Sequence, residues 1–326
     1  MQRGGEGKGR ALAGLVAAMA LAAAALSGCS SQQADAAPLS PGCALESPPA
    51  EGQDTLTVRQ GAESRSFTLA LPEIAGAAER VPLLLAFHGT SGQAESFLTQ
   101  TGLGEAATGR GMAVLAPQAE GSPAAWAIPG VAGLDDVEFV ETAIEQVGQL
   151  LCLDPDRVYA TGISGGAAMA AYYACASEQV AAIAPVAGVG LLRVCPDGPP
   201  LSVLAFHGDM DPIAPFSVDA EYTALTAGSF YIGDVREVVS GWGARESCKP
   251  QPRVEVLGDE ALDYRWLDCR TGSDVQLVVL AGGGHTWPGS DPPSAEVESF
   301  VGATSQAVGA TEQMLDFFDA HPRLRA

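Results

Sequence analysis

Short apolar runs alternate with amphipathic stretches along most of this chain. Segments 55–59 and 65–71 alternate polar and apolar residues around the turn 61–64, which predicts a β-hairpin. The strands predicted after it are apolar throughout, as parallel strands buried on both faces are. They are 82–87, 112–116, 157–161, 180–186, 201–206 and 275–280, and the predicted helices are 94–109, 135–151, 165–175 and 298–318. Strands that alternate with helices favour an α/β fold, with a mostly parallel sheet covered by helices on both faces.

Two adjacent carboxylates open the helix predicted at 135–151. Asp135 or Asp136 can cap this helix, since a negative charge at a helix N-terminus suits the helix dipole. A metal or catalytic pair is the alternative interpretation.

The first 50 residues lack this pattern. Arg3, Lys8 and Arg10 precede an uncharged apolar run at 11–26, as in a secretory signal segment, and a retained membrane anchor is the alternative. The run ends in Leu-Ser-Gly-Cys, which resembles the lipobox of bacterial lipoproteins. The resemblance implies cleavage before Cys29 and a lipid on that cysteine, which would hold the protein at the cell surface.

These features divide the chain into three regions. We expect a signal peptide at 1–28, a tether rich in proline and small polar residues at 29–50, and a single folded domain at 51–326.

Charge bears on the partners. The chain has 39 acidic and 17 basic residues and a formal net charge of −22. Such a surface repels nucleic acid and anionic lipid, so we expect no nucleic-acid partner and no membrane contact beyond the lipid anchor.

The strongest motif is Gly-Ile-Ser-Gly-Gly at 162–166. It follows the predicted strand 157–161 and precedes the predicted helix 165–175, which is the strand–turn–helix setting of a nucleophile elbow. Ser164 is therefore the candidate nucleophile, presented at the N-terminus of a helix where negative charge is stabilised.

A serine hydroxyl needs a base to act as a nucleophile, and a histidine is the expected one. His88 and His207 each end an apolar strand, and His321 lies in the polar tail. His285 lies in a glycine-rich loop directly after the predicted strand 275–280, late in the chain, where a base can reach the elbow. His285 is therefore the candidate base.

The orienting acid should lie between serine and histidine in the chain. The stretch after strand 201–206 offers Asp209 and Asp211. Asp211 precedes a proline, which favours an extended conformation that points out of the turn. Asp209 is better placed to hold the turn through its own backbone.

Four segments together identify relatives: His-Gly-Thr at 88–90, the elbow at 162–166, His-Gly-Asp-Met-Asp-Pro at 207–212 and Gly-Gly-His-Thr-Trp-Pro-Gly at 283–289. The set resembles the polyhydroxybutyrate depolymerase and feruloyl esterase family, secreted α/β-hydrolases grouped with carbohydrate esterase family 1. The resemblance covers about 55–318 and implies an α/β-hydrolase fold, a carboxylic ester as substrate and Asp211 as the catalytic acid. The region of Trp126 has fewer aromatic residues than this family usually shows there.

A reaction of this kind needs two donors for the oxyanion. The expected donors are the backbone N–H groups of Gly165 and Thr90, with His88 shaping the loop that carries Thr90. Trp287 and Trp126 either line the substrate pocket or pack in the core. The mechanism calls for no cofactor and no metal.

Cysteines number seven, and six remain if Cys29 is lipidated. An even count in an exported protein favours disulfides. Cys248 and Cys269 flank probable antiparallel strands at 253–257 and 261–267, whose outer ends meet, and a cysteine pair is common in this region of the resembled family. Cys152 and Cys175 are both expected at the edge of the sheet opposite the active site, which leaves Cys43 for Cys195.

Three functions compete. An extracellular ester hydrolase acting on a polyhydroxyalkanoate, a feruloylated or acetylated polysaccharide or a small ester is the leading interpretation. A peptidase is the second, although the chain has no additional lid-sized domain. An inactive binding lipoprotein is the third, and the intact set of serine, acid and histidine argues against it.

Overall fold

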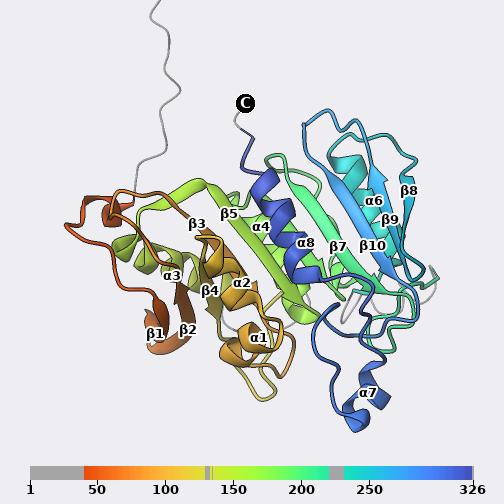
Figure 1. Cartoon of the computed structure of the whole chain (residues 1–326), viewed down its shortest axis with the longest axis horizontal. Coiled ribbons are helices and arrows are strands. Elements are labelled where there is room, and N and C mark those ends of the chain that lie inside the picture. Colours follow the sequence, from red (N-terminus) through yellow and green to blue (C-terminus); the bar gives the residue numbers. More distant parts are fainter. Residues whose placement is uncertain (1–39, 129–132, 134, 220–230, 325–326) are drawn as a thin grey trace, which may run out of the picture. The chain divides into compact units, whose positions relative to one another are not determined.

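The structure is a computed structural model that describes residues 40–128, 133, 135–219 and 231–324 (Figure 1). These residues belong to one unit, Pro38–Ala326. The predicted signal peptide, the predicted lipidation site Cys29 and residues 29–39 of the predicted tether lie outside the described residues. None of the described helices is both long and apolar enough to cross a bilayer.

A ten-stranded sheet forms the centre of the described part, in the order β1-β2-β4-β3-β5-β6-β7-β10-β9-β8. The strands are β1 (Gly52–Gln60), β2 (Glu63–Leu71), β3 (Val81–Phe87), β4 (Ala113–Pro117), β5 (Leu153–Ile163), β6 (Ala182–Val186), β7 (Ser202–Gly208), β8 (Arg253–Leu257), β9 (Ala261–Trp266) and β10 (Val275–Leu280). Strands β4, β3, β5, β6, β7 and β10 run parallel. The hairpin β1–β2 adds antiparallel to one side of this group and the hairpin β9–β8 to the other. The predicted mostly parallel sheet is confirmed.

Helices cover both faces of the sheet (Figure 1). They are α1 (Ala94–Gln100), α2 (Leu103–Gly109), α3 (Asp136–Leu150), α4 (Gly165–Ser177), α6 (Val235–Arg245), α7 (Ala295–Val301) and α8 (Ala310–Ala320), with short 3-10 helices η1 (Pro41–Ala44) and η2 (Val189–Leu191). Strand side chains alternate between two cores. Leu83 and Leu85 face the core formed with α3, α4 and α6, whereas Leu84 and Ala86 face the core formed with α1, α2 and α8.

Two predicted helices are each split in the structure. The segment 94–109 forms α1 and α2, because Gly102 between them has a left-handed backbone with φ of 65°. The segment 298–318 is interrupted between α7 and α8, where the carbonyls of residues 301, 303 and 305 accept from backbone N–H groups of the loop that carries His285 instead of from a further turn of helix. Helix α6, between β7 and β8, was not predicted.

Asp135 caps α3 as expected, accepting from the backbone N–H groups of Val137 and Glu138 at 3.0 and 3.1 Å. Asp136 is buried and pairs with Arg65, so these two carboxylates have separate structural partners and the alternative of a shared metal or catalytic pair is not supported.

Three disulfides join Cys43 to Cys152, Cys175 to Cys195 and Cys248 to Cys269. The predicted pair Cys248–Cys269 is confirmed. The other two predicted pairs, Cys152–Cys175 and Cys43–Cys195, are wrong.

The reason for the correction lies at the junction of α3 and β5. There Ser40 Oγ donates to Leu151 O at 2.7 Å and accepts from Leu153 N at 2.9 Å, which brings η1 and Cys43 against Cys152. Cys175, near the end of α4, is thereby left for Cys195 in the segment that leads into β7.

Candidate active site

Ser164 lies in a strained turn between β5 and α4. Its φ of 58° and ψ of −125° are rarely adopted by a residue with a side chain, and its N–H donates to Val186 O at 3.0 Å. A β-carbon on Gly166 would collide with the backbone carbonyls of Phe87 and His88. The glycine of the motif is therefore required by the close approach of α4 to the end of β3, and the turn presents Ser164 as predicted from the sequence.

Asp211 and His285 meet at the same edge of the sheet. His285 Nδ1 lies 2.7 Å from Asp211 Oδ2, and both side chains are buried. Asp211 Oδ1 accepts from the N–H groups of Ile213 and Ala214, each at 2.8 Å, so the carboxylate is fixed on both oxygens. An ionised carboxylate only accepts, so Nδ1 of the neutral imidazole must carry the proton and Nε2 is left with a lone pair. This is the tautomer that a general base needs.

The loop that carries His285 is held by backbone bonds from a segment the sequence analysis did not identify. Gly284 N–H donates to Ala303 O at 2.8 Å and His285 N–H to Val301 O at 2.6 Å. Gly302, an isolated glycine within the pattern that predicted a helix, was the available signal.

Asp209 supports the same loop from the other side. Its Oδ1 accepts from Gly282 N–H at 2.7 Å, so Asp209 holds the loop of His285, whereas a bond to its own turn was expected. Its side chain is exposed and bonds to Gly282, whereas Asp211 bonds to His285. The two candidate acids thus differ in position, and Asp211 is the one that meets the histidine.

The other three histidines, His88, His207 and His321, differ from His285 in their hydrogen-bond partners. Ala119 N–H donates to His88 Nε2 at 3.1 Å, so Nδ1 of His88 donates to Gly89 O at 2.7 Å. Burial lowers the pKa of His88 and keeps it neutral, as suits a residue that shapes a loop. His207 Nε2 lies 2.8 Å from Ala214 O and 3.4 Å from Asp211 Oδ2, and burial lowers the pKa of His207 too. His321 lies beside Asp274, before β10, at 2.8 Å.

The structure brings Thr90 and Gly165 together. A β-carbon on Gly165 would lie 2.9 Å from Thr90 Oγ1 and 3.8 Å from Thr90 N. A β-carbon on Gly89 would lie 3.5 Å from Ser164 Cβ. The loop after β3 and the first residue of α4 therefore flank the serine, which is the arrangement expected of two backbone donors for an oxyanion.

The two predicted substrate-binding tryptophans lie in the cores instead. Trp126 is 2% exposed and donates from Nε1 to His88 O at 2.7 Å. Trp287 is 4% exposed, donates to Thr311 Oγ1 at 2.9 Å and packs edge-on against Phe97. Each ring is enclosed and its N–H is used, so the alternative of packing holds for both.

Known proteins resemble this chain in sequence. A model of the family described as Esterase PHB depolymerase matches residues 65–221. The "Putative esterase NocK" of Nocardia uniformis subsp. tsuyamanensis is 29% identical over 288 residues, which cover 81% of this chain and 82% of that protein. Feruloyl esterase B of Piromyces equi is 26% identical over 213 residues, 63% of this chain but only 39% of that protein.

Solved structures show the same fold at low identity. An acetyl xylan esterase from Aspergillus awamori aligns with a TM-score of 0.54 and 14% identity, covering 76% of this chain and 98% of that one. A dienelactone hydrolase-like promiscuous phosphotriesterase, P91, from metagenomic libraries aligns with a TM-score of 0.51 and 17% identity, covering 84% and 100%. Both alignments support the α/β-hydrolase fold. The chain is a carboxylic ester hydrolase of the α/β-hydrolase fold, and its sequence is similar to the polyhydroxybutyrate depolymerase and feruloyl esterase family.

Proposed function

We propose that Ser164, His285 and Asp211 form the catalytic triad of this ester hydrolase. The observation that carries the proposal is the 2.7 Å contact between His285 Nδ1 and Asp211 Oδ2, at the sheet edge where the elbow presents Ser164. The contact fixes the imidazole as the Nδ1–H tautomer and stabilises the imidazolium that forms during the reaction.

The reaction then proceeds through an acyl-enzyme. His285 Nε2 takes the proton of Ser164 Oγ as the oxygen attacks the ester carbonyl, and the carbonyl oxygen becomes an oxyanion between the N–H groups of Gly165 and Thr90. Each such donor contributes about 3 kcal/mol of transition-state stabilisation. His285 gives its proton to the leaving alcohol, then activates water that releases the acid and frees Ser164.

The substrate we propose is an extracellular ester: a polyhydroxyalkanoate-type polyester, or a feruloyl or acetyl ester of a polysaccharide. Support comes from the family match and from relatives named as feruloyl esterases. A panel of p-nitrophenyl butyrate, methyl ferulate and a polyhydroxybutyrate film separates these classes. A peptide amide added to the panel tests the peptidase alternative.

Ser164→Ala tests the triad directly. We expect loss of nearly all esterase activity, a fall of about 10⁵-fold or more in kcat, with the melting temperature retained. A fluorophosphonate probe should label the parent enzyme at Ser164 and not the variant. An unlabelled parent enzyme with no activity on the whole panel would favour the inactive binding lipoprotein instead.

We also propose that the enzyme is exported and anchored through a lipid on Cys29, with 1–28 as signal peptide, 29–50 as tether and 51–326 as the catalytic domain. Three disulfides fit an oxidising compartment. Cys29→Ser should release the protein or leave an unprocessed precursor. Intact mass spectrometry that finds an unmodified Cys29 at the mature N-terminus would contradict the anchor.

A further inference from the structure

We infer that Trp126 is a positioning residue for the oxyanion, and that the buried ion pair between Arg65 and Asp136 holds it in place. The inference rests on the proposed function, since it concerns the loop that would supply the Thr90 donor. Two segments are involved. Residues 88–92 are called the oxyanion loop, and residues 118–127 are called the bracing loop.

Trp126 lies between the two proposed oxyanion donors. Its Nε1 donates to His88 O at 2.7 Å, and its ring meets that of Phe87 edge-on at 5.2 Å. A β-carbon on Gly165 would lie 4.0 Å from Trp126 Cδ1. The carbonyl that Trp126 holds belongs to the peptide directly before the one that contains Thr90 N–H. Gly89 O, in the peptide that contains Thr90 N–H, is held by His88 Nδ1 at 2.7 Å and by Gly92 N–H at 2.9 Å, and the indole N–H adds a bond to the peptide before it, so it contributes to the direction of the Thr90 donor.

The rest of the bracing loop holds the oxyanion loop at further points. Ala119 N–H donates to His88 Nε2 at 3.1 Å, and Ser91 N–H donates to Ala124 O at 2.8 Å. Ser91 has a φ of 64°, an unfavourable conformation that an external bond helps to maintain. The oxyanion loop is therefore shaped by its neighbour and not by its own turn alone.

Arg65 and Asp136 in turn anchor both ends of the bracing loop. Arg65 Nη2 donates to Asp136 Oδ1 at 2.7 Å and to Gln118 O, at the start of the loop, at 3.3 Å. Asp136 Oδ2 accepts from Ala127 N–H, at its end, at 2.6 Å. The Arg65 guanidinium also lies 4.0 Å over the ring of Phe139 in α3.

Stability alone does not explain an ion pair in this position. Arg65 is 0% exposed and Asp136 is 3% exposed, and the desolvation of two such charges commonly offsets their attraction. Apolar side chains of similar volume would stabilise the fold as well. They would not fix the backbone at residues 118 and 127, which is what the pair does through directed bonds.

A preorganised donor acts on the transition state more than on the bound substrate, and this gives the inference a kinetic signature. Trp126→Phe keeps an aromatic ring in the core and removes only the N–H donor. We expect kcat for p-nitrophenyl butyrate to fall at least about tenfold, since a small misplacement of a catalytic group has effects of this size, while KM stays close to the parent value. The inhibition constant of phenylboronic acid, which forms a tetrahedral adduct with serine, should rise by a similar factor.

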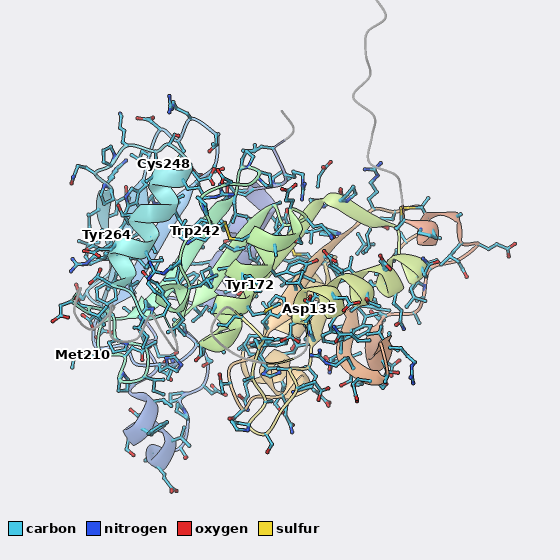
Figure 2. The ribbon with its side chains drawn as sticks, turned by 180° about the vertical axis from the view of Figure 1, so that it is seen from behind. Asp135, Tyr172, Met210, Trp242, Cys248 and Tyr264 are labelled. Atoms are coloured by element: carbon cyan, nitrogen blue, oxygen red, sulfur yellow. A yellow bond between two sulfur atoms is a disulfide. The ribbon has the colours of Figure 1, made fainter. Side chains whose placement is uncertain are left out.

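Trp242→Phe is the matched control. Trp242 is buried in α6, within the same core, and its ring lies 5.5 Å from the guanidinium of Arg245 in the same helix (Figure 2). We expect it to lower the melting temperature while kcat and the boronic acid constant remain those of the parent enzyme. All rates are measured below the melting transition, so that loss of folded protein does not enter them.

A Trp126→Phe enzyme with the kcat and boronic acid affinity of the parent would overturn the inference, whatever its melting temperature. If that variant does not fold, Asp136→Asn decides. It weakens the hold on Ala127 and Arg65, and it should shift the same two constants in the same direction. Unchanged constants in it would equally overturn the inference. An active Ser164→Ala enzyme would instead contradict the proposed function and the inference with it, so the two failures are distinguishable.

Discussion

The two ends of the parallel strands are held together in different ways. Where the strands finish, the loops with Ser164, Asp211 and His285 are fixed by hydrogen bonds from backbone groups and carboxylates. The three disulfides lie in the segments that lead into the strands. Cys152 directly precedes β5, Cys195 precedes β7 and Cys269 precedes β10. Figure 2 places Cys248 and Met210, the residue before Asp211, toward opposite ends of the domain.

The difference indicates that one end of the strands contributes mainly to stability and the other to the placement of the proposed catalytic groups. A disulfide stabilises mainly by restricting the unfolded chain, so it works at any distance from the site. A catalytic group must be held in one direction, which short directed bonds achieve. Substitutions at the two ends should therefore change different measurements.

The largest effect should come from the acid at the catalytic end. Asp211→Asn keeps the size of the side chain but permits the wrong imidazole tautomer, and we expect kcat to fall about 10⁴-fold with little change in melting temperature. Asp209→Asn is the control, because the amide oxygen can still accept from Gly282 N–H and activity should remain within about tenfold of the parent. If Asp209→Asn is the inactive variant and Asp211→Asn is not, the assignment of the acid is wrong.

Removing disulfides should give the opposite result. Cys43 and Cys152 are 109 residues apart, so replacing both by Ser should lower the free energy of unfolding by roughly 4.7 kcal/mol. The same change at Cys248 and Cys269, 21 residues apart, should cost about 3 kcal/mol. Urea unfolding measures both values, and kcat per folded molecule should stay unchanged. A fall in kcat for either variant would contradict the separation of the two ends, and peptide mapping without reductant checks the three pairs beforehand.

The smallest effect should appear with pH, and it should come from the catalytic end. Burial lowers the pKa of His88 and of His207, so the folded protein binds fewer protons than the unfolded chain below the ordinary histidine pKa of about 6.5. Stability is therefore full above that value and declines as the pH falls below it, by at most about 1.4 kcal/mol per pH unit for each histidine.

Melting temperatures between pH 5 and 8 measure this slope. His88→Gln removes one titrating group and should flatten the curve below pH 6.5. An unchanged slope in His88→Gln would show that His88 is not one of the groups responsible.

Much of the catalytic end could be predicted from sequence because its chemistry is local. The turn at Ser164 needs glycines at fixed positions, and Asp211 and His285 each follow directly on an apolar strand. A parallel sheet brings such strand ends together without further information. The disulfides at the other end were harder to predict. The pairing of Cys43 with Cys152 depends on the contact of the segment before β1 with the junction of α3 and β5, and Ser40, which makes this contact, lies within the predicted tether.

Supporting groups were missed for a related reason. For Trp126 the sequence left both a substrate pocket and core packing open, because a tryptophan in a loop looks alike whether its ring faces solvent or the core. Segment 301–305 was predicted as helix because its carbonyls have two possible partners, the next turn of the helix or the histidine loop, and composition does not distinguish them. Helix α6 was overlooked although Asp234 and Glu237 at its start form a recognisable cap.

The bonds from Gly284 to Ala303 and from His285 to Val301 also mean that the proposed active site needs residues near the end of the chain. A copy synthesised only as far as β10 carries Ser164 and Asp211 but not the proposed base, and one that stops at Gly289 lacks the backbone bonds that residues 301 and 303 give to the loop of His285. Hydrolysis is thus acquired near the end of biosynthesis, after the nucleophile has long been made. We therefore expect copies that end before residue 301 to have little esterase activity.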